Sequence, residues 1–344
     1  MSQAAVDDLT RKGAERGVDL RPGLALVEQR LRTTAAAQLP FLQTAARYLV
    51  DAGGKRFRPM LVLLTGAYAG GDVVDDDLVD AGVVVELVHL STLYHDDVID
   101  AAEVRRGAPA VHVKWSNTVA ILTGDFLLAR ASELSAALGV EVTRIMARTI
   151  AELCSGQIRE VQGSAAGLAA GAPPIVADRD HYVHVIGEKT ASLIASSCRL
   201  GALLAGAPDD AIETVTQFGW RLGMSFQLAD DVLDLASLPS ESGKEPGTDL
   251  REGVRTLPVL LALEAEGPGS LLAKLLDDPT EGNVATALEL LREHPALALA
   301  RDAARLEAAK AKRALRALPA DTPQAVTALE GLAYLADYAA GRVG

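Results

Sequence analysis

The stretch from Ser91 to Gly107, STLYHDDVIDAAEVRRG, constrains this chain more than any other, because it gathers acidic and then basic groups in one short segment. It holds three aspartates followed by two arginines: Asp96, Asp97, Asp100, Arg105 and Arg106. If the segment is helical, the first and last aspartates are four residues apart and share a face. Neighbouring carboxylates repel one another, and Mg²⁺ takes oxygen ligands while keeping room for substrate phosphates. Because a guanidinium group binds phosphate oxygens in a bidentate way, the stretch predicts a metal-bridged phosphate site.

A second cluster of the same form lies further along, in SFQLADDVLD from Ser225 to Asp234. On a helix, Asp230 and Asp234 would share a face, with Asp231 adjacent. The residues between them are apolar, and burying an unpaired charge is costly, so a solvated helix end is the weaker interpretation here. Two inward-facing carboxylate clusters in a helix bundle are typical of a metal site.

A third DDxxD pattern, formed by Asp75, Asp76, Asp77 and Asp80, has a simpler explanation. Acidic residues in the first turn of a helix interact favourably with its dipole. No arginine pair follows this cluster, so we interpret it as structural. The acidic pattern alone is therefore weak evidence in a chain this acidic.

Helix is favoured along almost the whole chain, because aromatic residues are only 4% and alternating β-branched runs are hard to find. We expect helices at about 41–52, 60–68, 78–99, 118–138, 140–163, 180–204, 209–235, 258–264, 283–293, 296–318 and 323–340, with a loop at 101–117. Glycine- and proline-rich breaks at 165–174 and 237–253 separate some of them, and the second break is long enough to be functional. We predict one all-helical catalytic domain over 1–344, with a loosely ordered N-terminal segment at 1–22.

Charge and composition narrow the function. A net charge of -13 argues against a nucleic-acid partner, for which a basic face is expected. Two cysteines are too few for a disulfide framework and fit a reducing cytosol. No run approaches the ~20 apolar residues of a membrane span, and the N-terminus has no apolar signal region. We expect a cytoplasmic protein, although a lipid product could bring it to a membrane surface.

Five blocks, in order, closely resemble the all-trans polyprenyl diphosphate synthase family: GGKRFRP (53–59), HLSTLYHDDVID…RRG (89–107), GEKTASL (187–193), FQLADDVLD (226–234) and GKEPGTDL (243–250). The resemblance covers roughly residues 25 to 340. There are two departures: Arg255 stands where the family often has lysine, and Gln157 stands near a position that is often glutamate.

The resemblance implies an all-α bundle of the isoprenoid synthase type, usually a homodimer, with the two aspartate motifs facing each other across a deep central cavity. It implies an Mg²⁺ cluster, of three ions with bound allylic diphosphate, on Asp96, Asp97, Asp100, Asp230, Asp231 and Asp234. The residues that it implies on the allylic diphosphate are Arg105, Lys189, Thr190, Gln227 and Lys244. Those that it implies on isopentenyl diphosphate are Lys55, Arg58, His89 and Arg106. The catalytic set would be Asp96, Asp97, Asp100, Arg105, Lys189, Asp230 and Lys244.

Small residues just before the first motif predict a long product. Short-chain members of the family typically place a bulky aromatic residue there, whereas this chain has Ser91 and Thr92, with Val88 a turn further back. The expected reaction is Mg²⁺-dependent prenyl transfer from an allylic diphosphate to isopentenyl diphosphate, with hexaprenyl to decaprenyl products. The alternatives are a geranylgeranyl diphosphate synthase, a terpene cyclase or the non-catalytic subunit of a two-component synthase. The primer, the pathway and the need for a second subunit stay open.

Overall fold

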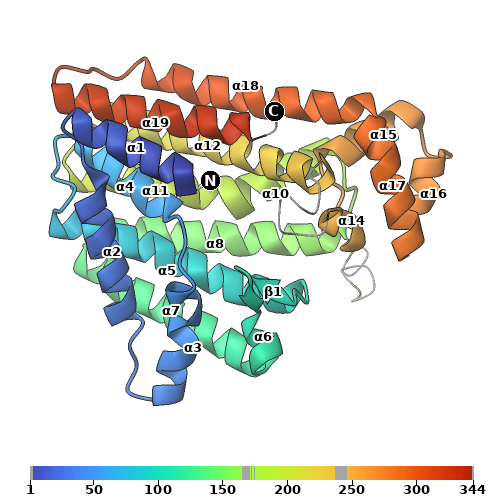
Figure 1. The fold of residues 1–344 in the computed structure, drawn as a ribbon, viewed down its shortest axis with the longest axis horizontal. Helices are drawn as coiled ribbons and strands as arrows, with labels where there is room; N and C mark the ends of the chain where they lie inside the picture. The colour runs from blue at the N-terminus through green and yellow to red at the C-terminus, as the bar shows by residue number, and fades with distance from the viewer. Residues whose placement is uncertain (1–2, 165–170, 172, 174, 237–245, 343–344) are drawn as a thin grey trace. The chain divides into compact units, whose positions relative to one another are not determined.

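The computed structural model describes residues 3–164, 171, 173, 175–236 and 246–342. The helices in its first half are α1 (Gln3–Glu15), α2 (Leu20–Thr34), α3 (Pro40–Asp51), α4 (Phe57–Tyr68), α5 (Asp76–Ile99), α6 (Val111–Lys114), α7 (Asn117–Ala137) and α8 (Val140–Gly163). The later ones are α10 (Arg179–Ile186), the π-helix η1 (Gly187–Ala191), α11 (Ser192–Leu204), α12 (Asp209–Ala236), α14 (Thr248–Arg251), α15 (Leu257–Glu266), α16 (Leu271–Leu276), α17 (Glu281–Glu293), α18 (Pro295–Leu315) and α19 (Pro323–Gly341). The all-α prediction is confirmed (Figure 1).

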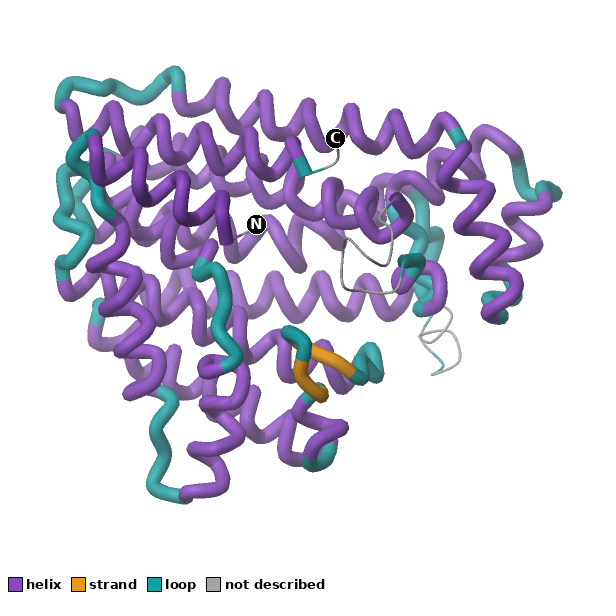
Figure 2. Tube along the Cα trace, in the orientation of Figure 1, coloured by secondary structure: helices purple, strands orange, loops and turns teal. Residues whose placement is uncertain are grey.

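The predicted loop at 101–117 contains a short β-hairpin that we did not predict from the sequence. Strands β1 (Val104–Arg105) and β2 (Ala108–Pro109) pair antiparallel, and they are the two strands among the described residues (Figure 2). Arg106 and Gly107, which connect them, have φ of 54° and 77°. A two-residue hairpin turn with positive φ at both central positions follows the twist of its strands. Arg105 therefore lies in strand β1, whereas Arg106 has the left-handed backbone conformation of the turn.

The segment at 1–22, which we expected to be loosely ordered, contains α1 at Gln3–Glu15, and its degree of order stays a prediction. Val6 and Leu9 are three residues apart and both are buried, so this short helix has an apolar face to pack. Gly17, at φ 95°, then turns the chain before α2 begins at Leu20. Single-domain organisation stays a prediction.

By its internal contacts, the chain divides into two compact units, which are described separately. The first unit comprises Met1–Ile150, Leu193–Gly219 and Ala314–Tyr334. Its centre is α5, which contacts α2, α4 and α7 along its length (Figure 1). A helix that is apolar on all sides belongs in a core, and α5 is buried almost continuously from Leu78 to Val88. The acidic start of α5 is structural as expected: Asp75 caps the helix, and Arg30 pairs with Asp76 and Asp80.

The second unit comprises Ala151–Ser192, Trp220–Arg313 and Leu335–Gly344. Its core gathers side chains from the C-terminal half of α12 with others from α10, α15, α17 and α18. Gly156 and Gly223 let α8 and α12 approach η1, since a Cβ on either would lie 2.6 Å or less from backbone atoms of that π-helix. π-helical turns inside α-helices are frequent at functional sites. In the part of the chain that is described, no helix combines the length and apolar character needed to cross a bilayer.

Candidate active site

The first aspartate motif ends helix α5, and its three carboxylates are not equivalent. Asp96 and Asp100 lie on a partly exposed face of the helix, whereas Asp97 is fully buried. Arg105 reaches back from β1, and its Nε and Nη2 atoms both lie 2.6 Å from Oδ1 of Asp97. The guanidinium group that we expected on a phosphate therefore has a carboxylate partner within the protein. The outer two aspartates remain as the accessible pair.

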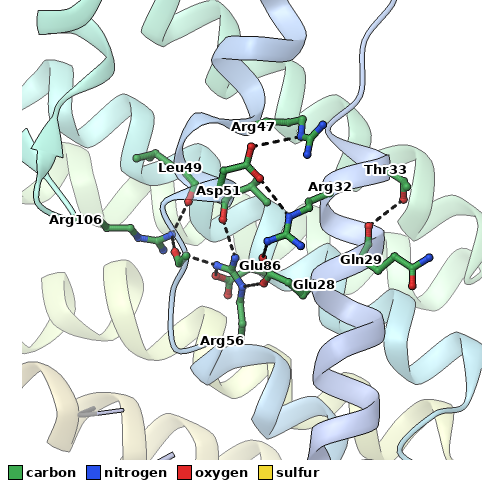
Figure 3. Close-up of polar contacts among 12 residues, drawn as sticks. Glu28, Gln29, Arg32, Thr33, Arg47, Leu49, Asp51, Arg56, Glu86 and Arg106 are labelled. Carbon is green, nitrogen blue, oxygen red and sulfur yellow. Dashed lines mark hydrogen bonds and ion pairs between the residues drawn. The ribbon is translucent and has the colours of Figure 1, made fainter.

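A group of arginines surrounds the turn that leads into α4, and Figure 3 labels Arg32, Arg47, Arg56 and Arg106 among them. Arg56 is buried between two acids, with its Nε 2.7 Å from Glu28 and its Nη1 3.0 Å from Glu86. Burial opposes its charge, but the bonds and charges of these acids raise the pKa of Arg56. Two buried or half-buried acids match this one cation, so Arg56 is structural. It also holds the left-handed turn that starts α4, at φ 49°.

The neighbouring arginines, Arg58 and Arg106, have no acidic partners of this kind among the described residues. Among the described residues no carboxylate lies within ion-pair distance of Arg58 or Arg106, and Nε of Arg58 is buried without a hydrogen-bond partner. Burial lowers the pKa of Arg58 to about 10, with Arg106 adding to the effect and Glu86 opposing it. Arg106 donates to the carbonyls of Leu49, at 2.8 Å, and Gly53. These two guanidinium groups are half-buried and have no acidic partner among the described residues, so a bound anion would compensate their charge.

His89 lies on the same partly exposed side of α5, near these arginines. Burial and the positive charges of Arg58, Arg106 and Arg105 lower the pKa of His89 well below its ordinary value. The ring is therefore neutral at pH 7 and can donate one hydrogen bond and accept another. Lys55 is exposed in the loop before α4. The structure thus brings Arg58, His89 and Arg106 together as predicted.

The residues that we linked to product length separate onto different faces. Thr92 is partly exposed, one turn before Asp96, and its hydroxyl donates to the carbonyl of His89 at 2.8 Å. Ser91 is fully buried, and its hydroxyl donates at 2.9 Å to the carbonyl of Gly124 in α7. One residue along a helix is a rotation of about 100°, so these neighbours cannot line the same wall. Val88 is fully buried in the core.

The second motif lies near the end of α12, and its middle carboxylate is also buried. Asp231 accepts hydrogen bonds from the Tyr182 hydroxyl at Oδ2 and from Nε2 of Gln227, at 2.8 Å, at Oδ1. Burial raises the pKa of Asp231, while these two hydrogen bonds oppose the shift. Both of its oxygens already have protein donors. The metal-ligand role of Asp231 stays a prediction.

The outer carboxylates of the second motif have different partners. Asp230 pairs with Arg342 at 2.5 Å, and that guanidinium group stacks over the Phe226 ring. Asp234 accepts hydrogen bonds from the backbone N–H groups of Thr248, at 3.1 Å, and Asp249, at 3.2 Å. The end of α12 is thereby tied to the start of α14.

The π-helix η1 presents the next two predicted residues. Lys189 pairs with Glu160 of α8, and Thr190 donates to Oε1 of Gln227 at 2.8 Å. The basic residue expected on a diphosphate therefore has an acidic neighbour. Lys244, also predicted to contact the diphosphate, lies outside the described residues.

Sequence reasoning missed three residues of this half-site: Tyr182, Glu160 and Asp249. Burial, with the charges of Asp234 and Asp231, raises the pKa of Asp249 well above its ordinary value. Asp249 could have been found, because it lies in the GKEPGTDL block. Tyr182 and Glu160 carry no local signal, since their roles depend on contacts between separate helices.

The accessible carboxylates suit a hard divalent cation, although not a site built from protein ligands alone. Among the described residues no group of three acidic, histidine or cysteine side chains is arranged to hold a metal. Mg²⁺ is commonly bound by one or two carboxylates together with substrate phosphates and water. Pairs such as Asp96 with Asp100, and Asp230 with Asp234, fit that mode.

Comparisons with known proteins agree with this geometry. Residues 39–291 match the model of the family described as Polyprenyl synthetase. The chain is 44% identical over 328 residues to nonaprenyl diphosphate synthase of Mycobacterium tuberculosis, an alignment that covers 94% of each chain. It is 38% identical to heptaprenyl diphosphate synthase component 2 of Geobacillus stearothermophilus, over 81% of this chain and 84% of the relative.

Solved structures give the same result. A polyprenyl synthase from Caulobacter crescentus, complexed with calcium and isoprenyl diphosphate, has a TM-score of 0.83 at 33% identity, with 98% of each chain covered. A decaprenyl diphosphate synthase from Rhodobacter capsulatus has a TM-score of 0.84 at 31% identity, covering 98% of this chain and 99% of the other. The all-helical fold is thus shared with solved polyprenyl synthases. This chain belongs to the polyprenyl synthetase family.

Proposed function

We propose that this enzyme is a long-chain polyprenyl diphosphate synthase, which adds isopentenyl diphosphate units to an allylic diphosphate. The observation that carries the proposal is the pair Arg58 and Arg106, whose half-buried charges have no acidic partner among the described residues and lie near neutral His89. A diphosphate supplies the charge that this cluster lacks. The products named for its relatives, nonaprenyl and heptaprenyl diphosphate, support a product in the hexaprenyl to decaprenyl range.

In the proposed reaction, the C–O bond of the allylic diphosphate breaks and its electron pair leaves with pyrophosphate. The double bond of isopentenyl diphosphate attacks the allylic cation, a new C–C bond forms, and a proton passes to the released pyrophosphate. Divalent ions, which we propose are Mg²⁺ in a three-ion cluster, neutralise the charge that grows on the leaving group. The outer carboxylates Asp96, Asp100, Asp230 and Asp234 would hold them.

The basic residues fall into two groups, one for each diphosphate substrate. Arg58 and Arg106, whose charges have no acidic partner among the described residues, would bind isopentenyl diphosphate together with neutral His89 and exposed Lys55. Lys189 has a carboxylate neighbour, and Arg105 is held by Asp97 at 2.6 Å. Each would reach the allylic diphosphate from a position fixed by its acidic partner. No side-chain nucleophile is required.

A homodimer is part of the proposal. Near the start of α7, Ile121 and Leu122 are 43% and 58% exposed, respectively, which leaves an apolar surface for a second copy of the chain. Light scattering of the eluting protein should give the mass of a dimer. A cytoplasmic location, with contact to a membrane during product release, also stays a proposal.

The test of the function is an elongation assay. The purified chain is incubated with Mg²⁺, farnesyl diphosphate and labelled isopentenyl diphosphate, and the products are separated by chain length. Long linear diphosphates support the proposal, and geranylgeranyl diphosphate supports the alternative of a shorter product. Cyclic hydrocarbons would indicate a cyclase, and turnover only with a second chain would indicate a subunit.

A control variant is built into the sequence, because two DDxxD patterns begin and end α5. Asp96→Asn should lower the rate at least ~100-fold, since removing a charge-stabilising group from a transition state costs about 3 kcal/mol or more. Asp76→Asn changes the same pattern at the other end of α5, where the carboxylate pairs with Arg30, and should leave the rate within about twofold. Equal losses would contradict the assignment.

Product length should depend on Thr92. Thr92→Phe is expected to shorten the products, whereas Thr92→Val, which keeps the volume, should not. Ser91→Phe should instead destabilise the protein, since the backbone of α7 lies against that side chain. An unchanged product distribution in Thr92→Phe would contradict the role of this face.

A further inference from the structure

A buried chain of four hydrogen-bonding side chains connects α10, α12 and η1. It runs from Tyr182 to Asp231, then through Gln227 to Thr190. Tyr182 and Asp231 are only 5% and 3% exposed, so water does not compete for these bonds. All four residues belong to the second compact unit. Their contacts are therefore internal to one body of the protein.

The direction of each hydrogen bond follows from the chemistry of the groups. The Tyr182 hydroxyl donates to Oδ2 of Asp231, and the Gln227 amino group donates to Oδ1. That fixes the Gln227 amide, whose oxygen then faces Thr190 at 2.8 Å. An amide oxygen only accepts, so the hydroxyl hydrogen of Thr190 points to Gln227. Thr190 is left with lone pairs on its partly exposed side.

We propose that Tyr182 is a positioning residue for prenyl transfer, which acts through Asp231 and Gln227 to fix the direction of the Thr190 hydroxyl. This inference rests on the proposed function. Thr190, so held, presents an acceptor and not a donor. It suits an electron-poor carbon of the substrate, because a phosphate oxygen would require a donor.

The surroundings of these four hydrogen-bonded side chains support this role. Tyr182 is buried in the core of its unit, so its hydroxyl has no access to a ligand of its own. Asp231 has a donor on each oxygen, so its carboxylate is used for orientation. Thr190 lies on the π-helix, which is pressed between Gly156 of α8 and Gly223 of α12. The π-helix fixes the position of Thr190, and the hydrogen-bonded chain fixes its polarity.

The test is a pair of double-mutant cycles in the full-length protein. Tyr182→Phe should lower kcat about tenfold, the size expected for one hydrogen bond of about 1.4 kcal/mol, with KM values within about threefold of wild type. Thr190→Val should lower kcat by a similar factor. If Tyr182 acts through Thr190, the double variant is no slower than the worse single variant, because coupled residues are not additive. Additive losses in kcat would overturn the positioning role.

Tyr94→Phe is the matched control. Tyr94 is equally buried, and its hydroxyl donates to the carbonyl of Ala45 at 2.7 Å in the other compact unit. Combined with Thr190→Val, it should give simple additivity. Coupling as strong as that of Tyr182→Phe would show a general loss of stability and would contradict the proposal.

A second cycle keeps the failure of this inference distinct from the failure of the proposed function. The denaturant midpoints of Tyr182→Phe, Gln227→Leu and their double variant report the shared Asp231 contact without any substrate. Midpoint shifts that are not additive support the hydrogen-bonded chain, and additive shifts overturn it. A wild-type protein that elongates nothing would overturn the function, and the positioning role for transfer with it.

Discussion

The two aspartate motifs have the same spacing but opposite surroundings. In the first, buried Asp97 is matched by a full charge on Arg105 at 2.6 Å, and the half-buried cations Arg58 and Arg106 have no acidic partner among the described residues. In the second, buried Asp231 receives two neutral donors. Burial, together with the charges of neighbouring acids, raises the pKa of Asp231 and of Asp249. Beside the first motif there are thus cations without acidic partners, and around the second there are acids that raise one another's cost of ionisation.

This difference indicates how each region would bind an anion. The arginine cluster beside the first motif would bind a diphosphate without a metal ion, whereas the carboxylates of both motifs require metal ions before they can hold an anion. The middle aspartate of each motif binds groups of the protein itself. Asp97 pairs with the charged Arg105, and Asp231 accepts hydrogen bonds from the neutral side chains of Tyr182 and Gln227. Removing a partner of the middle aspartate should therefore cost different amounts in the two motifs.

The largest effect should come from Arg105→Gln. It leaves Asp97 as a buried charge without its cation, which costs about 3–5 kcal/mol of unfolding free energy. Urea denaturation measures this loss. Adding Asp97→Asn should recover part of the stability, and a loss below about 1 kcal/mol in Arg105→Gln would break the comparison.

Two arginines of the first half-site should respond in opposite ways. Arg56→Leu leaves buried Glu86 without its cation and should cost about 3 kcal/mol. Glu28 keeps its pair with Arg32 in this variant. Arg58→Leu removes a half-buried charge that lacks an acidic partner, so stability should stay within about 1 kcal/mol or rise. Denaturant midpoints of the two variants test this, and a large loss in Arg58→Leu would show that its charge is structural.

In the second half-site, Gln227→Leu should cost about 1–2 kcal/mol, because it leaves a buried carboxylate with one donor in place of two. The loss should be clearly smaller than that of Arg105→Gln in the same denaturation experiment. Gln217→Leu, on an exposed part of α12, serves as the control and should be near neutral. Equal losses for Gln227→Leu and Arg105→Gln would remove the distinction between charge and dipoles.

The smallest effect concerns pH. Because the pKa of His89 is lowered in the folded protein, His89 binds a proton at a higher pH in the unfolded chain than in the folded protein. Stability should therefore fall as pH drops below about 6.5, by up to about 1.4 kcal/mol per pH unit. His89→Gln should flatten the slope between pH 6.5 and 5.5, while His184→Gln at an exposed position should leave it unchanged. A slope that His89→Gln does not alter would contradict the shifted pKa.

Local patterns were enough to predict the long helices and the two aspartate motifs, because the apolar and acidic residues recur at helical spacing in the sequence. The GGKRFRP block likewise gave Arg58, and the RRG segment gave Arg106. What stayed hidden depends on contacts between helices, such as Tyr182 with Asp231 or Ser91 with the backbone of α7. The hairpin at Arg106 and Gly107 was also missed, because a two-residue turn carries little periodic signal.

The most direct test is a calorimetric titration of isopentenyl diphosphate into the full-length protein without divalent metal. The arginine cluster beside the first motif predicts measurable binding, weakened at least ~10-fold by Arg58→Leu, the equivalent of about 1.4 kcal/mol. Arg305→Leu, at a half-exposed surface ion pair, should leave the affinity unchanged. Binding that requires Mg²⁺, or that Arg58→Leu does not weaken, would contradict the account of the arginine cluster as a diphosphate site that works without metal.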